Sequence, residues 1–246
     1  MTAVYLFAAG LLAGAVNAVA GGGPLLTLAA LTGLGFDPRI ANLSSTVALS
    51  PGQIFAGWSA RSRLLSLRER GQDLPSAFAV SLAGGAVGAG FLLVTDGAQF
   101  RAIVPWLVIL ATGIYAWSGR ARPAIERERR MPRPLFLTAL GISAIYGGYF
   151  GGGNSFVVLA LLATSGLADE AGGAVKNALI AAMNLGAVAL FVMSGEIDWP
   201  TVAVVGMGGL VGSAIGVRLL SRFDPAVFRH FIILCGVLLA AWFFVN

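Results

Sequence analysis

The 246-residue chain is more apolar than soluble domains are, with 57% hydrophobic and only 11% charged residues, where a typical soluble domain carries about 25% charged residues. So few charges cannot cover so much apolar surface in water, and lipid must therefore be the solvent for much of the chain. The formal net charge is +5, but the arginines cluster in short segments between apolar runs, which indicates membrane topology rather than nucleic-acid binding.

Eight apolar segments each approach the roughly 20 residues that a helix needs to cross a bilayer. In chain order they cover residues 3–20, 40–60, 75–95, 101–118, 134–150, 172–194, 199–219 and 226–245. Two further apolar runs, 24–34 and 154–166, are too short to cross, and each follows three consecutive glycines. We therefore expect an all-α, polytopic integral membrane protein with eight spanning helices and two short re-entrant half-helices. The first segment has no basic leader, so we expect a permanent helix and not a cleaved signal peptide.

The same features recur in the same order in the two halves of the chain. The first half contains NAVAGGGPLL, then Asn42, then LAGGAVGAG and an apolar run that ends at Trp117. The second half contains YGGYFGGGNSF, then Asn177, then MGGLVGSAIG and an apolar run that ends at Trp242. This order indicates a duplication: a first transmembrane repeat over 1–119, a charged cytoplasmic linker over 120–133 and a second repeat over 134–246.

The arginines predict how the repeats are oriented. Three segments, 61–70, 120–133 and 218–229, hold 13 of the 15 arginines, and such segments stay on the cytoplasmic side of a membrane. Each half must then make an odd net number of crossings, which places both termini outside and gives the halves opposite orientations. Many secondary transporters are built as inverted-topology repeats of this kind, with binding sites formed by broken helices at the repeat interface.

The two glycine breaks are the first candidate site. They consist of Gly21, Gly22, Gly23, Gly151, Gly152 and Gly153. Glycine costs about 1 kcal/mol in a helix interior, and Pro24 suits the first turn of a new helix, while Asn154 or Ser155 could cap the other. Two half-helix N-termini would then point inward with free N–H groups and positive dipole ends, which bind anions. The alternative is that the glycines only permit close helix packing; a break in each half favours a site.

Polar side chains within apolar helices are the second set of candidates: Asn17, Asn42, Thr46, Lys176, Asn177 and Asn184. An unpaired amide in hydrocarbon is costly, so each asparagine either bonds a neighbouring helix or contacts a ligand. Lys176 is the only lysine among 16 basic residues. It could act as a point charge for an anion, or extend its ammonium group to cytoplasmic water.

Several chemistries have no support in the sequence. None of the eleven acids falls clearly in the middle of an apolar segment, whereas cation and proton transporters usually need an intramembrane carboxylate. Cys235 is the only cysteine and His230 the only histidine, so we expect no disulfide, no metal site and no cofactor. No nucleophile motif of the GxSxG type occurs, and we predict that the protein is not an enzyme.

With NAVAGGGPLLT, ANLSSTVALSPG, YGGYFGGGNSF and KNALIAAMN in this order, nearly the whole chain resembles the TauE/SafE family of sulfite and organosulfonate exporters. The resemblance implies a bacterial inner-membrane permease for small sulfur anions. By motif it assigns functional positions to Asn17, Gly21, Gly22, Gly23, Asn42, Thr46, Gly151, Gly153, Lys176 and Asn177. The second break departs from the family pattern because Asn154 and Ser155 follow it where a glycine is expected.

The sequence thus predicts a transporter that exports small anions by alternating access, with the lipid bilayer and the anion as its partners. Two alternatives remain open at this stage: a passive anion channel, and a membrane protein that does not transport but assembles or anchors a partner. A homodimer is also left open, and no nucleic-acid partner is expected.

Overall fold

A computed structural model of the chain describes residues 1–19, 21–59, 61, 74–125, 131–165, 167, 170–218 and 225–245. Within these ranges the chain forms ten helices and no strand. The helices are α1 (Thr2–Val19), α2 (Gly23–Gly33), α3 (Pro38–Ser59), α5 (Leu74–Val94), α6 (Gly97–Ile125), α7 (Arg133–Tyr149), α8 (Asn154–Thr164), α9 (Glu170–Ser194), α10 (Trp199–Arg218) and α11 (Pro225–Val245). The all-helical polytopic fold is confirmed.

Four helical segments are long and apolar enough to cross a membrane by length and composition: Leu74–Val94, Gly97–Ile114, Gly172–Ser194 and Trp199–Arg218. The apolar stretches Thr2–Ala18 and His230–Val245 are slightly shorter. The helix α3 contains the polar residues Asn42, Ser44, Ser45 and Thr46, which lower its mean hydropathy. Their side chains are buried in the protein interior. The predicted total of eight crossings stays a prediction.

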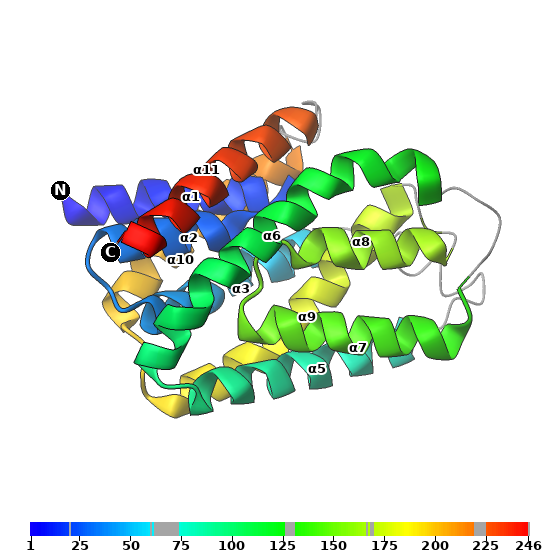
Figure 1. Cartoon of the computed structure of the whole chain (residues 1–246), viewed down its shortest axis with the longest axis horizontal. Helices are drawn as coiled ribbons and strands as arrows, with labels where there is room; N and C mark the ends of the chain where they lie inside the picture. The colour runs from blue at the N-terminus through cyan, green and yellow to red at the C-terminus, as the bar shows by residue number, and fades with distance from the viewer. Residues whose placement is uncertain are drawn as a thin grey trace.

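The two short helices leave the middle of the molecule in opposite directions (Figure 1). The helix α2 runs from its start at Gly23 toward the end where both chain termini lie, and α8 runs from Asn154 toward the other end. Each has only 11 residues, or about 16 Å at 1.5 Å per residue, which is roughly half of the hydrocarbon thickness.

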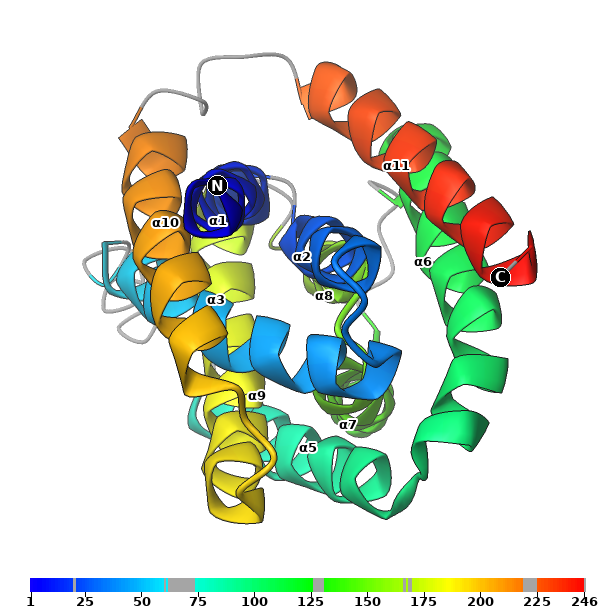
Figure 2. The ribbon, with the colours of Figure 1, turned by 90° about the vertical axis from the view of Figure 1, so that its left-hand side faces the viewer.

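The helix contacts follow a twofold pattern that relates α1, α2, α3, α5 and α6 to α7, α8, α9, α10 and α11. The pair α1–α10 corresponds to α5–α7, the pair α3–α10 to α5–α9, and the pair α2–α11 to α6–α8. The helices α3 and α9 contact each other, as do α6 and α11, and the latter two form one outer wall (Figure 2). The most extensive helix contacts therefore join one half of the chain to the other.

Glycines bring the backbones together in the pairs α1–α10 and α5–α7. A Cβ atom added to Gly14 would lie 2.0 Å from the carbonyl oxygen of Gly209, and one added to Gly88 would lie 2.0 Å from that of Ile145. No side chain fits at these distances, so the glycines set how closely the helices approach. Small residues serve helix packing in membranes because they allow such close backbone contact.

The sequence-based helix bounds agree with the structure to within about four residues, except at the end of α6. We expected this helix to end near residue 118, but it continues to Ile125 and takes in the first part of the charged linker. Alanine and arginine are strong helix formers, and a helix can extend into water once its side chains are polar. Residues 62–73, 126–130 and 219–224, which include seven of the 15 arginines, lie outside the described residues, and the sidedness stays a prediction.

Candidate functional site

The first break separates α1 from α2. The N–H of Gly21 donates to the carbonyl oxygens of Val16 at 3.2 Å and Asn17 at 3.0 Å, which closes the last turn of α1. Gly21 has a φ of +78°, a left-handed conformation that residues with a Cβ adopt at a cost. Gly22 precedes the new helix, and Pro24 lies in its first turn, as predicted, where the missing proline N–H costs nothing.

The second break separates α7 from α8 and has the same construction. The N–H of Gly151 bonds the carbonyl of Tyr146 at 3.3 Å, and Gly151 and Gly153 have φ values of +80° and +73°. The left-handed Gly153 directly precedes α8. Both triple glycines therefore interrupt the helix itself and do more than allow close packing.

The two breaks lie against each other. A Cβ atom added to Gly21 would lie 2.1 Å from both Cβ and Oγ of Ser155, and one added to Gly152 would lie 3.2 Å from Cδ2 of Leu25. The starts of α2 and α8 thus meet near the middle of the molecule. The first N–H groups of any helix lack intrahelical partners, so positive dipole ends from both halves converge on one region.

Two side chains bind backbone carbonyl groups that the second break leaves without helical partners. Asn42 on α3 donates from Nδ2 to the carbonyl oxygen of Tyr149 at 2.9 Å, and the hydroxyl of Tyr146 donates to that of Gly152 at 2.6 Å. Freed backbone groups inside a membrane must be satisfied by protein or cavity water. Asn42 therefore stabilises the broken helix, a role that its sequence position alone could not distinguish from ligand binding.

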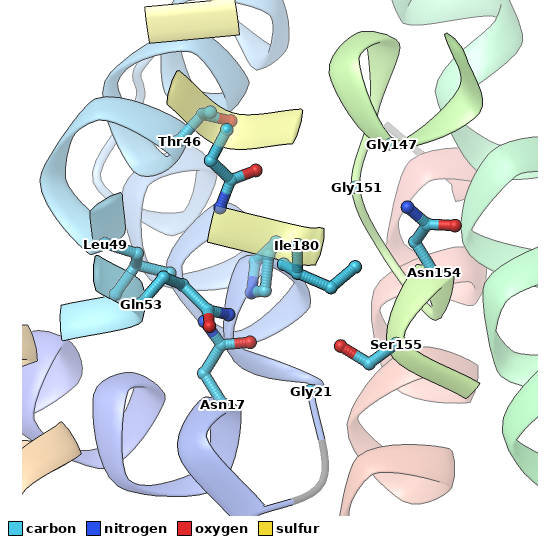
Figure 3. A pocket seen from close by; sticks show the side chains of 12 residues that line it. Asn17, Gly21, Thr46, Leu49, Gln53, Gly147, Gly151, Asn154, Ser155 and Ile180 are labelled. Carbon is cyan, nitrogen blue, oxygen red and sulfur yellow. The ribbon is translucent and has the colours of Figure 1, made fainter. Parts of the chain in front are cut away.

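A cavity lies between the breaks and the helices α3 and α9 (Figure 3). Asn17, Thr46 and Gln53 lie on one side of it, and Asn154 and Ser155 on the other. The complete lining is Asn17, Gly21, Pro24, Thr46, Leu49, Gln53, Gly147, Gly151, Asn154, Ser155, Ile180 and Asn184. The cavity has a volume of about 20 Å³, which is room for about one water. No charged side chain of the described chain lines it.

The lining brings together half of the predicted site residues, from both halves of the chain: Asn17, Gly21, Thr46, Gly151, Asn154, Ser155 and Asn184. The remaining predicted residues lie outside it: Gly22, Gly23, Asn42, Gly152, Gly153, Lys176 and Asn177. Gly23 still shapes the site, because a Cβ there would lie 2.6 Å from Cβ of Asn17. Of the lining side chains, Thr46 has its hydroxyl proton engaged, since Oγ1 donates to the carbonyl of Asn42 at 3.0 Å.

The expectation that Asn154 or Ser155 caps α8 was wrong. Gly153 occupies the capping position, and no side chain bonds the helix start. Instead, Oδ1 of Asn154 accepts from the Ser143 hydroxyl at 2.5 Å, and Nδ2 donates to Sδ of Met183 at 3.3 Å. Asn154 already lies within the first turn of α8, and its side chain fits over Gly147, where a Cβ would lie 2.3 Å from Nδ2.

Lys176 is buried, with 5% of its surface exposed, and no carboxylate pairs with it within the described ranges. It precedes Ile180 by four residues and Asn184 by eight, so it shares their face of α9. At 1.5 Å per residue, it lies about 6 Å along the helix axis from the Ile180 position. The backbone position of Lys176 is therefore about one helical turn from the nearest lining residue of α9, and Lys176 itself does not line the cavity.

Sequence reasoning missed Gln53, a buried polar residue of the lining with 3% exposure. A signal was present, because Gln53 follows Thr46 by seven residues and so lies on the same helix face, two turns further. The apolar Leu49 and the nearby Pro51 lie between Thr46 and Gln53, and they made this polar face of α3 difficult to recognise in the sequence.

A multi-pass helical bundle with two broken helices meeting at one buried cavity has the architecture of a membrane transporter, and known proteins of similar sequence carry that description. The chain is 30% identical to "Probable membrane transporter protein YfcA" of Escherichia coli (strain K12), over 96% of this chain and 87% of the relative. It is 28% identical to a "Probable membrane transporter protein" of Haemophilus influenzae, over 96% and 92%, and 25% identical to "Probable membrane transporter protein ORF9" of Sinorhizobium sp, over 96% and 90%. No solved structure matches the chain.

The model of the family "Sulfite exporter TauE/SafE" matches residues 6–243, and the chain therefore belongs to this family. The resemblance that the glycine motifs predicted is confirmed. The protein is a membrane transporter, as the names of the family and of the relatives indicate.

Proposed function

We propose that the protein exports small sulfur oxyanions, sulfite or organosulfonates, across a bacterial inner membrane by alternating access. The observation that carries this proposal is the meeting of the two helix breaks, with Gly21 of one against Ser155 of the other, at a cavity lined from both halves. The family name supports the substrate class and the direction. Both termini would face outward, and the 120–133 linker would face the cytoplasm.

Neutral dipoles would bind the anion. The first N–H groups of α2 and α8 converge from opposite sides, and a helix N-terminus favours negative charge. The Asn17 and Asn184 amides and the Ser155 hydroxyl line the cavity and supply further donors to the oxygens. Fixed donors in a water-poor site need little reorganisation to bind charge.

Lys176 would supply the positive charge. A buried ammonium group with no counter-ion is costly, with an effective penalty of several kcal/mol. Lys176 is 5% exposed and unpaired in the described structure, so an anion in the neighbouring cavity would offset part of that cost. We expect Lys176 to set the affinity for negative charge, while the amides and N–H groups set the orientation of the anion.

A cavity with room for about one water is too small for an oxyanion of four or more heavy atoms. The cavity must therefore widen when substrate enters, and we assign the present conformation to a closed state. In inverted-repeat transporters, access alternates when one repeat or bundle moves against the other around a fixed site. The close backbone contacts of α1 with α10 and of α5 with α7 favour movement of these pairs as units.

The membrane potential would drive export. Moving one negative charge out of a cell with a negative interior gains about 2.3 kcal/mol per 100 mV, so a carrier without a coupled cation could still concentrate substrate outside. The test is sulfite flux in proteoliposomes across which a potassium gradient and valinomycin impose a potential. Flux should rise as the sulfite-containing side becomes negative, and flux independent of the potential would contradict uncoupled electrogenic export.

Two comparisons in the same vesicles separate the alternatives. A passive channel would show single-channel currents in a planar bilayer, whereas a carrier would show saturable flux without them. A protein that only assembles or anchors a partner would retain its cellular activity when Lys176 and Asn17 are replaced by alanine and lose it when loop arginines are changed. A transporter should show the opposite pattern.

A further inference from the structure

Gln53 has hydrogen-bonding capacity that the protein does not use. Its side chain is 3% exposed and lines the cavity from α3, near Asn17 (Figure 3). Its Oε1 is fully buried and accepts no hydrogen bond from the described residues. An unsatisfied buried acceptor costs about 1–3 kcal/mol, and this carbonyl oxygen therefore destabilises the protein as long as no donor binds it.

The neighbouring side chains do not provide a donor for this oxygen. The Thr46 hydroxyl donates to the carbonyl of Asn42, Nδ2 of Asn154 donates to Sδ of Met183, and Oδ1 of Asn154 is occupied by Ser143. Asn17 lies beside Gln53 in the cavity wall, yet no hydrogen bond joins the two amides. Oε1 itself has almost no accessible surface in this conformation, so water in the cavity does not reach it, and a substrate reaches it only when the cavity widens to admit the anion.

We propose that Gln53 is a specificity-determining residue that accepts a hydrogen bond from the substrate. This inference rests on the proposed function and narrows the substrate class to monoanions that carry a hydroxyl group, as a hydrogen-bond donor, beside the oxyanion. The oxyanion contacts the N–H groups and donor side chains around the two breaks, and the donor contacts Oε1 of Gln53. A substrate without a donor leaves this oxygen unpaired in the loaded cavity.

A site built to bond a polar group discriminates strongly against an analogue that lacks it, because its own buried partner is then left unpaired. Apolar contact alone discriminates far less. The carbonyl of Gln53 therefore makes the site favour hydroxylated over plain alkylsulfonates of the same charge and chain length.

The test uses two probes that differ by one hydroxyl, 2-hydroxyethanesulfonate and ethanesulfonate, in proteoliposomes under the same imposed potential. The wild-type protein should move the hydroxylated probe about tenfold faster or more at sub-saturating concentration, as one hydrogen bond to a buried acceptor requires. Gln53→Met has a similar shape and no acceptor amide. It should bring the ratio of rates close to one, because the hydroxylated probe loses its hydrogen bond to Oε1 and is slowed more than ethanesulfonate.

Ser81→Ala is the matched control, because Ser81 on α5 is also fully buried with an unpartnered hydroxyl but does not line the cavity. It should leave the ratio unchanged. Equal rates of the two probes in the wild type, or a ratio that persists in Gln53→Met, would overturn the role of Gln53 and leave the proposed transport intact. A wild-type protein that moves neither probe nor sulfite would overturn the proposed function itself.

Discussion

Gly21 and Ser155 are in direct contact across the boundary between the two halves of the chain. A Cβ atom on Gly21 would lie 2.1 Å from Oγ of Ser155, although 134 positions of sequence separate the two residues. The contact joins the first glycine of one helix break to the first turn of the helix that follows the other. Movement of α1 relative to α8 must therefore change the geometry of the cavity.

We predict that Gly21→Ala lowers both stability and transport. The left-handed φ of +78° costs an alanine about 1–2 kcal/mol, and the new methyl group also collides with Ser155. Thermal unfolding in detergent and sulfite flux in vesicles measure the two effects.

Gly35→Ala is the control for this prediction, because it separates the cost of the left-handed backbone conformation from the cost of the collision with Ser155. Gly35 has a similar φ of +88°, but nothing lies within 4 Å of the position of its Cβ. We expect this variant to lose stability through strain alone and to retain transport. Equal transport by Gly21→Ala and Gly35→Ala would show that the contact with Ser155 has no functional role.

The sequence predicted the two breaks because their cause is local. Three consecutive glycines disfavour a helix, and the apolar runs behind them are too short to cross a bilayer, so no tertiary information was needed. The helix bounds followed for the same reason, except in α6, where the polar extension to Ile125 carries no apolar signal.

Which polar residues line the cavity depends on contacts between segments that are far apart in the chain. These contacts could not be predicted from the sequence. Asn17 lines the cavity, whereas Asn42 bonds the backbone of Tyr149, yet both are asparagines in apolar helices. Asn154 resembles a cap in sequence, but Ser143 and Met183 draw its side chain toward α7 and α9. The choice between binding a ligand and bonding the protein is made by neighbours that are far away in the chain.

The bond from Asn42 to the carbonyl of Tyr149 predicts a stability effect. Asn42→Ala removes the donor and leaves a backbone oxygen unpaired beside the second break, which costs about 1–3 kcal/mol. We expect a lower melting temperature and a faster loss of folded protein in detergent.

Ser44→Ala is the control for this prediction, because Ser44 is buried on the same helix and its hydroxyl has no partner in the described structure. Its removal should be neutral or slightly stabilising. A melting temperature of Asn42→Ala equal to that of Ser44→Ala would show that the bond to Tyr149 contributes nothing.

Arg39 at the start of α3 connects the two halves at the end of the molecule where the termini lie. It pairs with Glu196 in the turn between α9 and α10 and donates to the carbonyls of Leu92 and Leu93 at 3.1 and 3.0 Å. Because Arg39→Gln loses the pair and the carbonyl bonds together, it should destabilise more than Glu196→Gln. Each hydrogen bond of a charged group contributes about 1.5–3 kcal/mol.

A double-mutant cycle of these two variants measures the coupling, which should exceed that of the nearby pair Arg101–Asp37. That pair is 3.6 Å apart with side chains 61% and 38% exposed, and such exposed pairs contribute about 0–1 kcal/mol. A coupling between Arg39 and Glu196 no larger than that of the exposed pair would refute their role as a connection between the halves.

The predicted sidedness can be tested by thiol labelling in a Cys235→Ala background, which leaves the chain without cysteine. Leu34 lies in the turn after α2 and is 41% exposed, and Pro132 is exposed before α7. If the arginine-rich segments are cytoplasmic, a membrane-impermeant maleimide should label Leu34→Cys in intact cells and Pro132→Cys only after permeabilisation. The reverse pattern would place both termini in the cytoplasm. The negative cell interior would then lie on the side of the protein where the termini are, which is the side that we assign to the outside.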